Sequence, residues 1–218
     1  MRRPLLRSIT SALALLAVVG CSSMYYKTWE KLGWAKRDIL VDRVKDARDD
    51  QEAAKKQFQT TLQRFQEVTN FSGGDLEAKY KKLNGDYESC EGRADDVRKR
   101  IASVEKVAGD MFSEWRDELK QYSNADLRRA SEQKLTETQD RYRQLIGVMK
   151  QAENKMSPVL AAFHDQVLFL KHNLNAQAIA SLQSTASGIE GDVAKLIKDM
   201  EASISEANAF IDQMNKKS

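Results

Sequence analysis

The sequence predicts an all-α fold, an elongated antiparallel bundle of about four long helices with coiled-coil-like packing. Three observations support this prediction. Ala, Leu, Glu, Lys, Gln and Arg dominate the composition, as they do in long helices. Beyond residue 20 the only proline is Pro158. Apolar residues recur at steps of three and four within four segments that turn-forming residues separate. The alternative is a three-helix bundle in which the region around Pro158 packs differently.

The first predicted helix spans residues 24–70. Its apolar seam alternates steps of four and three without a slip, through Leu40, Val44, Ala47, Gln51, Ala54, Phe58, Thr61, Phe65 and Val68. Charged and amide side chains surround this seam and form the solvated face. The pattern stops at Gly73 and Gly74, which indicate a turn, and either Ser72 or Asp75 can cap the helix that follows.

The second predicted helix spans residues 75–122 and repeats the same spacing. Its seam runs through Leu76, Tyr80, Leu83, Tyr87, Cys90, Ala94, Val97, Ile101, Val104, Ala108, Met111 and Trp115. Leu119 and Tyr122 extend this seam one residue out of phase. Residues 123–126 then provide a turn and a helix cap, because Ser, Asn and Asp favour both.

The last two predicted helices span residues 125–172 and 175–215, with Asn175 as the N-cap of the fourth. The third carries apolar positions from Leu127 to Leu170, and helical spacing continues beyond Pro158. A proline is tolerated at a first helical position after a serine cap, so the helix could break and restart here or continue with a kink, and we expect a kink in a continuing helix. The short predicted loops make neighbouring helices antiparallel.

The N-terminus predicts export and lipidation. Residues 1–20 combine basic residues with an apolar run too short to span a bilayer, as in a signal peptide. Gly20 followed by Cys21 resembles a bacterial lipobox, where the cysteine is lipidated and the chain is cut before it. The mature domain would then be residues 21–218, carrying palmitate at Cys21. Ser22, in place of Asp, favours the outer membrane. The alternative is an ordinary secreted protein.

Charge argues against nucleic acid as a partner. Of the 35 basic residues, Arg2, Arg3 and Arg7 lie in the signal segment, whereas none of the 32 acidic residues does. The mature chain therefore has 35 − 3 = 32 basic and 32 acidic residues, a net charge of zero. The basic balance that would attract a polyanion is lost with the signal peptide.

The second cysteine and a cluster of aromatic residues are the remaining candidates for a site. With Cys21 lipidated, Cys90 is the only remaining thiol, and its seam position favours burial over an intermolecular disulfide. Four aromatic side chains lie close to the predicted anchor, where they could sit at the membrane interface or cap the bundle: Tyr25, Tyr26, Trp29 and Trp34.

No catalytic, cofactor-binding or metal-binding residue is predicted, and we do not expect an enzyme. His164 and His172 are eight residues apart, too far along a helix to bind one metal ion together. No serine lies in a G-x-S-x-G turn. Adjacent acidic residues such as Asp49 and Asp50 point to different faces of a helix.

Two stretches resemble a known family. Residues 25–27 with 34–43, and residues 170–176, resemble a family of bacterial lipoproteins catalogued as domain of unknown function 2959. The resemblance covers nearly all of the mature chain and implies a lipoprotein, with no established activity or site residues.

These features together predict a periplasm-facing structural or adaptor protein. It would be held in the membrane through Cys21 and would present coiled-coil surfaces to an envelope protein or to a second copy of itself. The alternative function is a ligand-binding or chaperone-like bundle, which a core cavity lined by Tyr80, Tyr87 and Tyr142 would favour.

Overall fold

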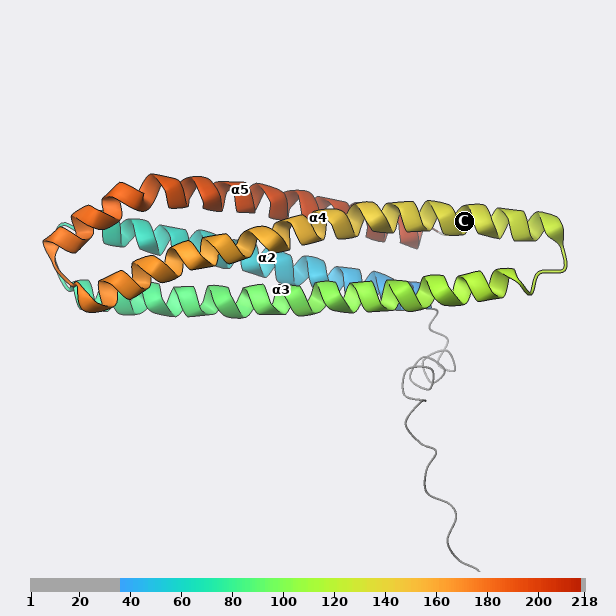
Figure 1. Ribbon diagram of the computed structural model, residues 1–218, viewed down its shortest axis with the longest axis horizontal. Coiled ribbons are helices and arrows are strands. Elements are labelled where there is room, and N and C mark those ends of the chain that lie inside the picture. The colour runs from blue at the N-terminus through green and yellow to red at the C-terminus, as the bar shows by residue number, and fades with distance from the viewer. Residues whose placement is uncertain (1–35, 217–218) are drawn as a thin grey trace, which may run out of the picture. The chain divides into compact units, whose positions relative to one another are not determined.

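The computed structural model describes residues 36–216, and these lie within one compact unit of four helices (Figure 1). The helices are α2 (Lys36–Thr69), α3 (Leu76–Leu119), α4 (Ala125–His172) and α5 (Ala176–Asn215). The four-helix prediction is confirmed. Pro158 lies inside α4, which continues through it, so the three-helix alternative is wrong. Residues 24–35 of the first predicted helix lie outside the described residues.

Side-chain caps begin three of the helices where the sequence predicts them. The Asp75 carboxylate accepts a hydrogen bond from the Ala78 amide at 3.0 Å, and Asn175 accepts one from Ala178 at 2.9 Å. Asn124 accepts two, from the amides of Asp126 and Leu127. Such a cap stabilises a helix by about 1 kcal/mol because it satisfies a donor that has no partner inside the helix.

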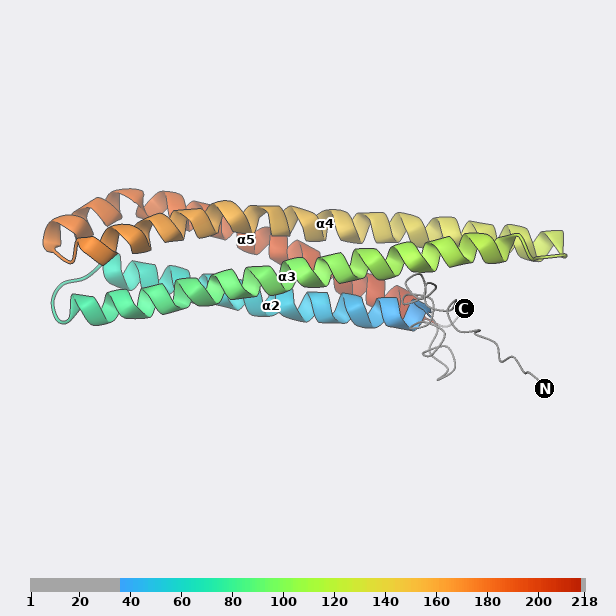
Figure 2. The ribbon, with the colours of Figure 1, turned by 60° about the horizontal axis from the view of Figure 1, so that its bottom comes forward.

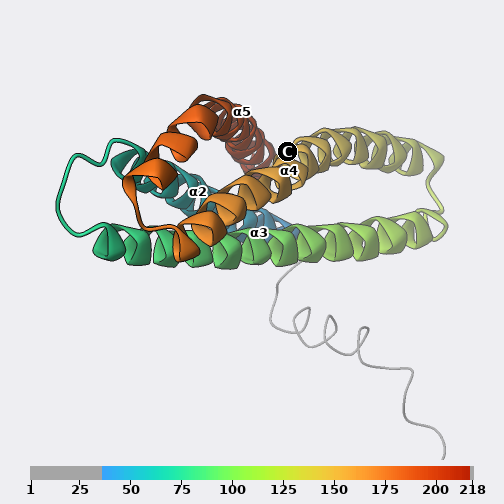
Figure 3. The same cartoon turned by 60° about the vertical axis from the view of Figure 1, so that its left-hand side comes forward.

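The four helices form a closed ring around one core. α2 packs against α3 and α5, and α4 packs against the same two helices from the opposite side (Figure 3). The rings of Phe65 and Phe163 meet across this core with 6.4 Å between their centroids. Every seam residue predicted for the first helix from Leu40 onward is fully buried. The heptad seams are therefore closed within a single chain.

Polar contacts at the edges of the seams fix the register between neighbouring helices. Arg100 binds Asp50 at 2.7 Å between α3 and α2, and Arg64 binds Asp86 at 3.0 Å between the same helices. Both pairs are only partly buried, and ion pairs that water still reaches contribute about 0–1 kcal/mol each. They favour one register over another more than they raise the free energy of unfolding.

The helices differ in length, so one hairpin projects beyond the others (Figure 2). Lys36, the first residue of α2, binds Glu114 of α3 at 2.7 Å, and α3 continues to Leu119. On the other side, Gln151 donates to Asp199 at 3.1 Å; this antiparallel register places Asn215, the end of α5, level with Leu135. The first ten residues of α4 therefore extend about 15 Å beyond α5. We call residues 115–134 the projecting hairpin.

A buried amide interrupts the apolar core near its middle. Gln51 of α2 is fully buried and accepts a hydrogen bond from the Ser203 hydroxyl of α5 at 2.8 Å. Its amide nitrogen has no hydrogen-bond partner. Leaving a buried donor unpaired costs about 1–3 kcal/mol, so Gln51 lowers the stability of the bundle that it helps to align.

We expect Gln51→Leu to raise the free energy of unfolding by about 1–3 kcal/mol, because it removes the unpaired donor and fills the same space with carbon. The Ser203 hydroxyl can then bond to a carbonyl of its own helix. Ser203→Ala should have the opposite sign, since it leaves both polar atoms of Gln51 unpaired. Urea unfolding followed by far-UV circular dichroism measures both variants, and a less stable Gln51→Leu protein would contradict the prediction.

Candidate functional site

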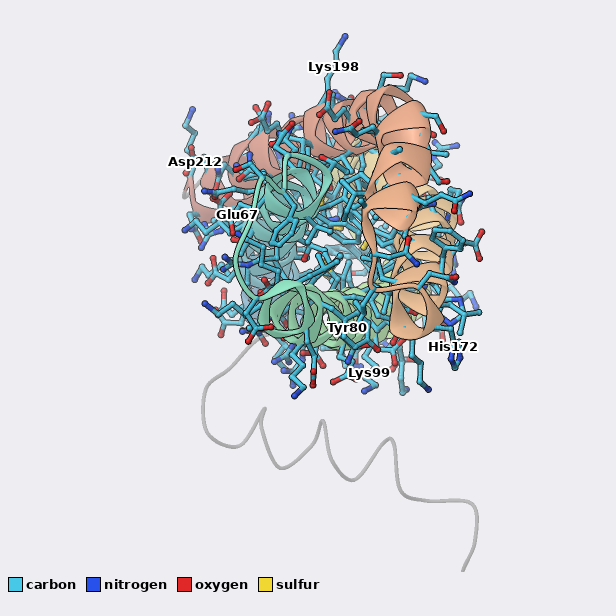
Figure 4. All side chains as sticks on the ribbon, turned by 90° about the vertical axis from the view of Figure 1, so that its left-hand side faces the viewer. Glu67, Tyr80, Lys99, His172, Lys198 and Asp212 are labelled. Atoms are coloured by element: carbon cyan, nitrogen blue, oxygen red, sulfur yellow. The ribbon has the colours of Figure 1, made fainter. Side chains whose placement is uncertain are left out.

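Exposed large apolar side chains lie only at the two ends of the bundle, among the described residues. Tyr122 and Leu127 are at the tip of the projecting hairpin, and Leu168, Phe169 and Leu174 are at the opposite end. The sides of the bundle carry charged and polar side chains instead. Figure 4 looks along the helices and shows these side chains radiating outward, with Lys198 and Asp212 pointing away from the core.

The tip of the projecting hairpin is held in a defined conformation. The Trp115 indole donates to the Ser131 hydroxyl at 2.9 Å and ties α3 to α4. The Asn124 cap fixes the first turn of α4, where Leu127 is 58% exposed. Tyr122, in the loop before it, is 42% exposed.

The sequence placed Tyr122 and Leu127 on the apolar seams, and their exposure corrects that expectation. α3 ends at Leu119, so Tyr122 lies in the loop and not on a helical seam. Leu127 is in α4 with the expected spacing, but it lies beyond the end of α5. A seam residue is buried only where another helix covers it. Leu119, which faces inward within the hairpin, is 8% exposed.

The outermost residues of the hairpin carry a basic excess. The whole projecting hairpin, residues 115–134, has five basic and four acidic residues, a net charge of 5 − 4 = +1. Its ten outermost residues, 120–129, contain Lys120, Arg128 and Arg129 against the single acid Asp126, a net charge of 3 − 1 = +2. Lys120 pairs with Asp117 at 2.7 Å, and Arg129 pairs with Asp126. No described residue forms an ion pair with Arg128. The tip therefore combines two exposed apolar side chains with positive charge.

The opposite end, which we call the distal end, presents Leu168, Phe169 and Leu174. Leu168 and Phe169 fall between the buried seam positions Val167 and Leu170, so they point out of the bundle. The Asn173 amide donates to the Phe169 carbonyl at 2.9 Å and orders the turn that carries Leu174. Leu168 and Phe169 are therefore exposed because they lie off the buried seam, and Leu174 is exposed on a hydrogen-bonded turn.

A charge-free stretch adjoins this end. Residues 172–189 contain no Asp, Glu, Lys or Arg, in a chain of which 31% is charged. The exposed face of α5 here carries small side chains such as Ala180, Ser184 and Ser187. This site was not among those predicted from the sequence, although the absence of charge and the off-seam Leu168 and Phe169 are both visible in it.

The three tyrosines considered for a ligand cavity are not brought together. Tyr87 packs against His164, with 5.7 Å between ring centroids and 44° between the ring planes, and burial raises the pKa of Tyr87. Tyr142 packs against Phe112 of α3, and burial raises its pKa to about 12. Phe112 is 25 residues from Tyr87 in the same helix, roughly 38 Å. One cavity lined by all three is therefore excluded.

The histidines are also separate. His164 lies beside Tyr87 with its Nδ1 atom 3.9 Å from Asp165, whereas His172 ends α4. Within residues 36–216 no group of three or more His, Cys, Asp and Glu side chains is arranged to hold a metal ion.

Cys90 is buried among apolar residues and is a free thiol. Its sulfur lies 3.1 Å from the Thr61 hydroxyl, which also donates to the Gln57 carbonyl. Burial raises the pKa of the Cys90 thiol to about 12, although the Thr61 hydrogen bond opposes the shift. The burial predicted for Cys90 is confirmed.

Comparison with known proteins places the chain in one family. Residues 25–214 match the family model described as Protein of unknown function (DUF2959). The chain belongs to this family. No curated protein and no solved structure matches it.

The family match confirms the resemblance drawn from residues 25–43 and 170–176. For this DUF2959 protein the predicted lipidation residue Cys21 lies outside the described residues, as do Tyr25, Tyr26, Trp29 and Trp34. Among the described helices none is both long enough and apolar enough to cross a membrane.

We expect the Cys90 thiol of the native protein to resist alkylation at pH 8, because its raised pKa keeps it protonated and burial excludes the reagent. Maleimide labelling of the Cys21→Ser chain, read by intact mass, should show little adduct natively and one adduct in guanidinium. Full labelling of the folded protein within minutes would show that the core opens around Cys90.

Proposed function

We propose that this protein is a lipid-anchored structural or adaptor protein of the bacterial cell envelope, with no catalytic role. Cys21 would carry the lipid at the outer membrane, and the helical bundle would face the periplasm. The observation that carries the proposal is the confinement of exposed large apolar side chains to the two ends of the described bundle.

The ends are connected by one uninterrupted helix. Leu127 and Leu168 are both in α4 and are separated by 168 − 127 = 41 residues, which is about 60 Å of helix. The intervening sides are covered with charge, and their ion pairs lie within one helix or between neighbouring helices of the same chain. This layout suits a spacer that holds one contact at a fixed distance from another.

The distal end has the chemistry of a protein interface. The cores of protein interfaces are depleted in charged residues and enriched in aromatic ones. Phe169 and its two leucine neighbours are exposed beside the charge-free stretch of residues 172–189. We propose that a protein of the envelope docks here.

The anchor is tested by Cys21→Ser, which removes the thiol that would be acylated. We expect loss of palmitate labelling and release of the chain from the membrane fraction, with the far-UV circular dichroism unchanged. Cys90→Ser serves as the control, because that thiol is buried in the bundle. Membrane retention and palmitate labelling of the Cys21→Ser chain would overturn the anchor.

The docking site is tested by a photo-crosslinking amino acid placed at Phe169 in cells. We expect one discrete adduct at this position and none when the same amino acid replaces Lys198, which projects from the side of α5 (Figure 4). Leu168→Ser should weaken the Phe169 adduct by removing apolar contact area. A band at twice the mass of the chain would identify a second copy as the partner, and the absence of any adduct at Phe169 would contradict distal docking.

A further inference from the structure

We propose that the tip of the projecting hairpin is a membrane-contact site, and that Tyr122 and Leu127 enter the interface of the lipid leaflet in which the chain is anchored. The proposal rests on the lipid anchor proposed above. It assigns a lipid surface, and no protein, as the occupant of this end of the bundle.

The chain path brings the tip within reach of that leaflet. Helix α2 begins at Lys36, at the end of the bundle from which the hairpin projects. Between Cys21 and Lys36 there are 36 − 21 = 15 residue steps. Fifteen steps measure about 22 Å if helical and about 50 Å if fully extended. Both lengths exceed the projection of the hairpin beyond α5, which is about 15 Å. A lipid on Cys21 therefore tethers this end closely enough for the tip to touch the bilayer.

The chemistry of the tip matches an anionic leaflet. Interfacial membrane contacts combine aliphatic and aromatic side chains with basic residues, and tyrosine is favoured at the level of the headgroups. The tip exposes Leu127 and Tyr122, and residues 120–129 carry a net charge of +2. Because the mature chain as a whole has no net charge, this excess is local. Lysine and arginine near the surface are attracted to anionic lipids.

The two ends of the bundle differ in their local net charge. The distal end also exposes apolar side chains, but its residues 165–174 contain one acid, Asp165, and one lysine, Lys171, a net charge of 1 − 1 = 0. The adjoining residues 172–189 contain no Asp, Glu, Lys or Arg. A surface without net positive charge gains little from an anionic leaflet. This difference in net charge is the reason for assigning the lipid contact to the tip and not to the distal end.

The tip is small, and its contact depends on the tether. Two apolar side chains would not hold a free protein on a bilayer, since even a single long acyl chain gives only marginal binding. A short linker raises the effective concentration of the second contact to the millimolar range. The tip then sets the orientation of the anchored bundle, with the distal end held away from the membrane.

Site-specific fluorescence on vesicles tests the contact. The lipidated full chain, with Cys90→Ala and Tyr122→Cys, is labelled at position 122 with an environment-sensitive fluorophore and reconstituted on vesicles of phosphatidylethanolamine and phosphatidylglycerol. We expect a blue-shifted emission and quenching by nitroxide-labelled lipids. The matched control is Leu174→Cys in the same background, a similarly exposed residue at the distal end. Quenching should be at least about threefold stronger at position 122, as expected for a probe within the headgroup region.

Two further variants separate the contributions. Leu127→Ser should reduce the quenching at position 122 without changing the circular dichroism, because Leu127 is 58% exposed and outside the core. Arg128→Gln should reduce it on anionic vesicles and leave it unchanged on zwitterionic ones.

The outcomes distinguish the tip from the anchor. Equal quenching at positions 122 and 174, with the chain still floating with the vesicles, would overturn the tip contact and leave the anchor intact. A lipidated chain that fails to float would overturn both. A blue shift at position 122 that grows with protein concentration in the absence of vesicles would assign the tip to a second copy and overturn the lipid contact.

Discussion

Four long amphipathic helices can remove their apolar seams from water only by packing against one another, and the rest of the structure depends on this mutual burial. In α2 each seam residue from Leu40 to Val68 is fully buried, although none of them could be covered within its own helix. The burial of such side chains stabilises a fold by about 25 cal/mol for each Å² of apolar surface removed from water. It also dictates that the remaining faces are polar, which leaves the sides of the bundle charged.

The buried contact between Gln51 and Ser203 is an exception to the apolar composition of the core. A leucine at position 51 would satisfy the apolar core, yet the amide is there with one polar atom unpaired. Buried polar residues at single seam positions specify register in coiled coils at a cost in stability. Here the hydrogen bond joins two helices 152 residues apart and favours one alignment of α2 with α5. Two helices with uniform apolar seams can shift by one heptad relative to each other without losing apolar contact. A buried polar pair disfavours that shift, and so it helps to fix which residues lie at each end of the bundle.

The two ends of the bundle matter most for function, because the described large apolar side chains that stay exposed lie there. The hairpin of α3 and α4 continues past the first residue of α2 and the last residue of α5. Leu127, which would be a core residue if another helix covered it, is therefore on the surface, and Tyr122 is exposed in the loop beside it. At the distal end the same outcome has a different origin, since Leu168 and Phe169 lie off the seam altogether. The proposed spacer, with one membrane-facing and one protein-facing end, rests on these two local features and on the length of α4.

Much of the fold was predictable because its determinants are local. Caps at Asp75, Asn124 and Asn175 begin helices where the sequence predicts them, since a cap acts within three residues of itself. Heptad spacing likewise identified the buried face of each helix, including Cys90. Spacing cannot say where a helix ends or how far its neighbour extends, and for that reason Tyr122 and Leu127 were placed on the apolar seams. Spacing also did not separate the tyrosines: Tyr87 of α3 packs on His164, whereas Tyr142 of α4 packs on Phe112.

The sequence by itself determined that the fold has four helices, where three of them begin and which face of each is apolar. The tertiary structure alone decided that the seams close within one chain, that Gln51 bonds to Ser203 and that one hairpin projects. The physical reason is the distance along the chain over which each interaction acts. Capping and periodicity act over a few residues, whereas register and overhang depend on the relative lengths and alignment of helices that are distant in the chain.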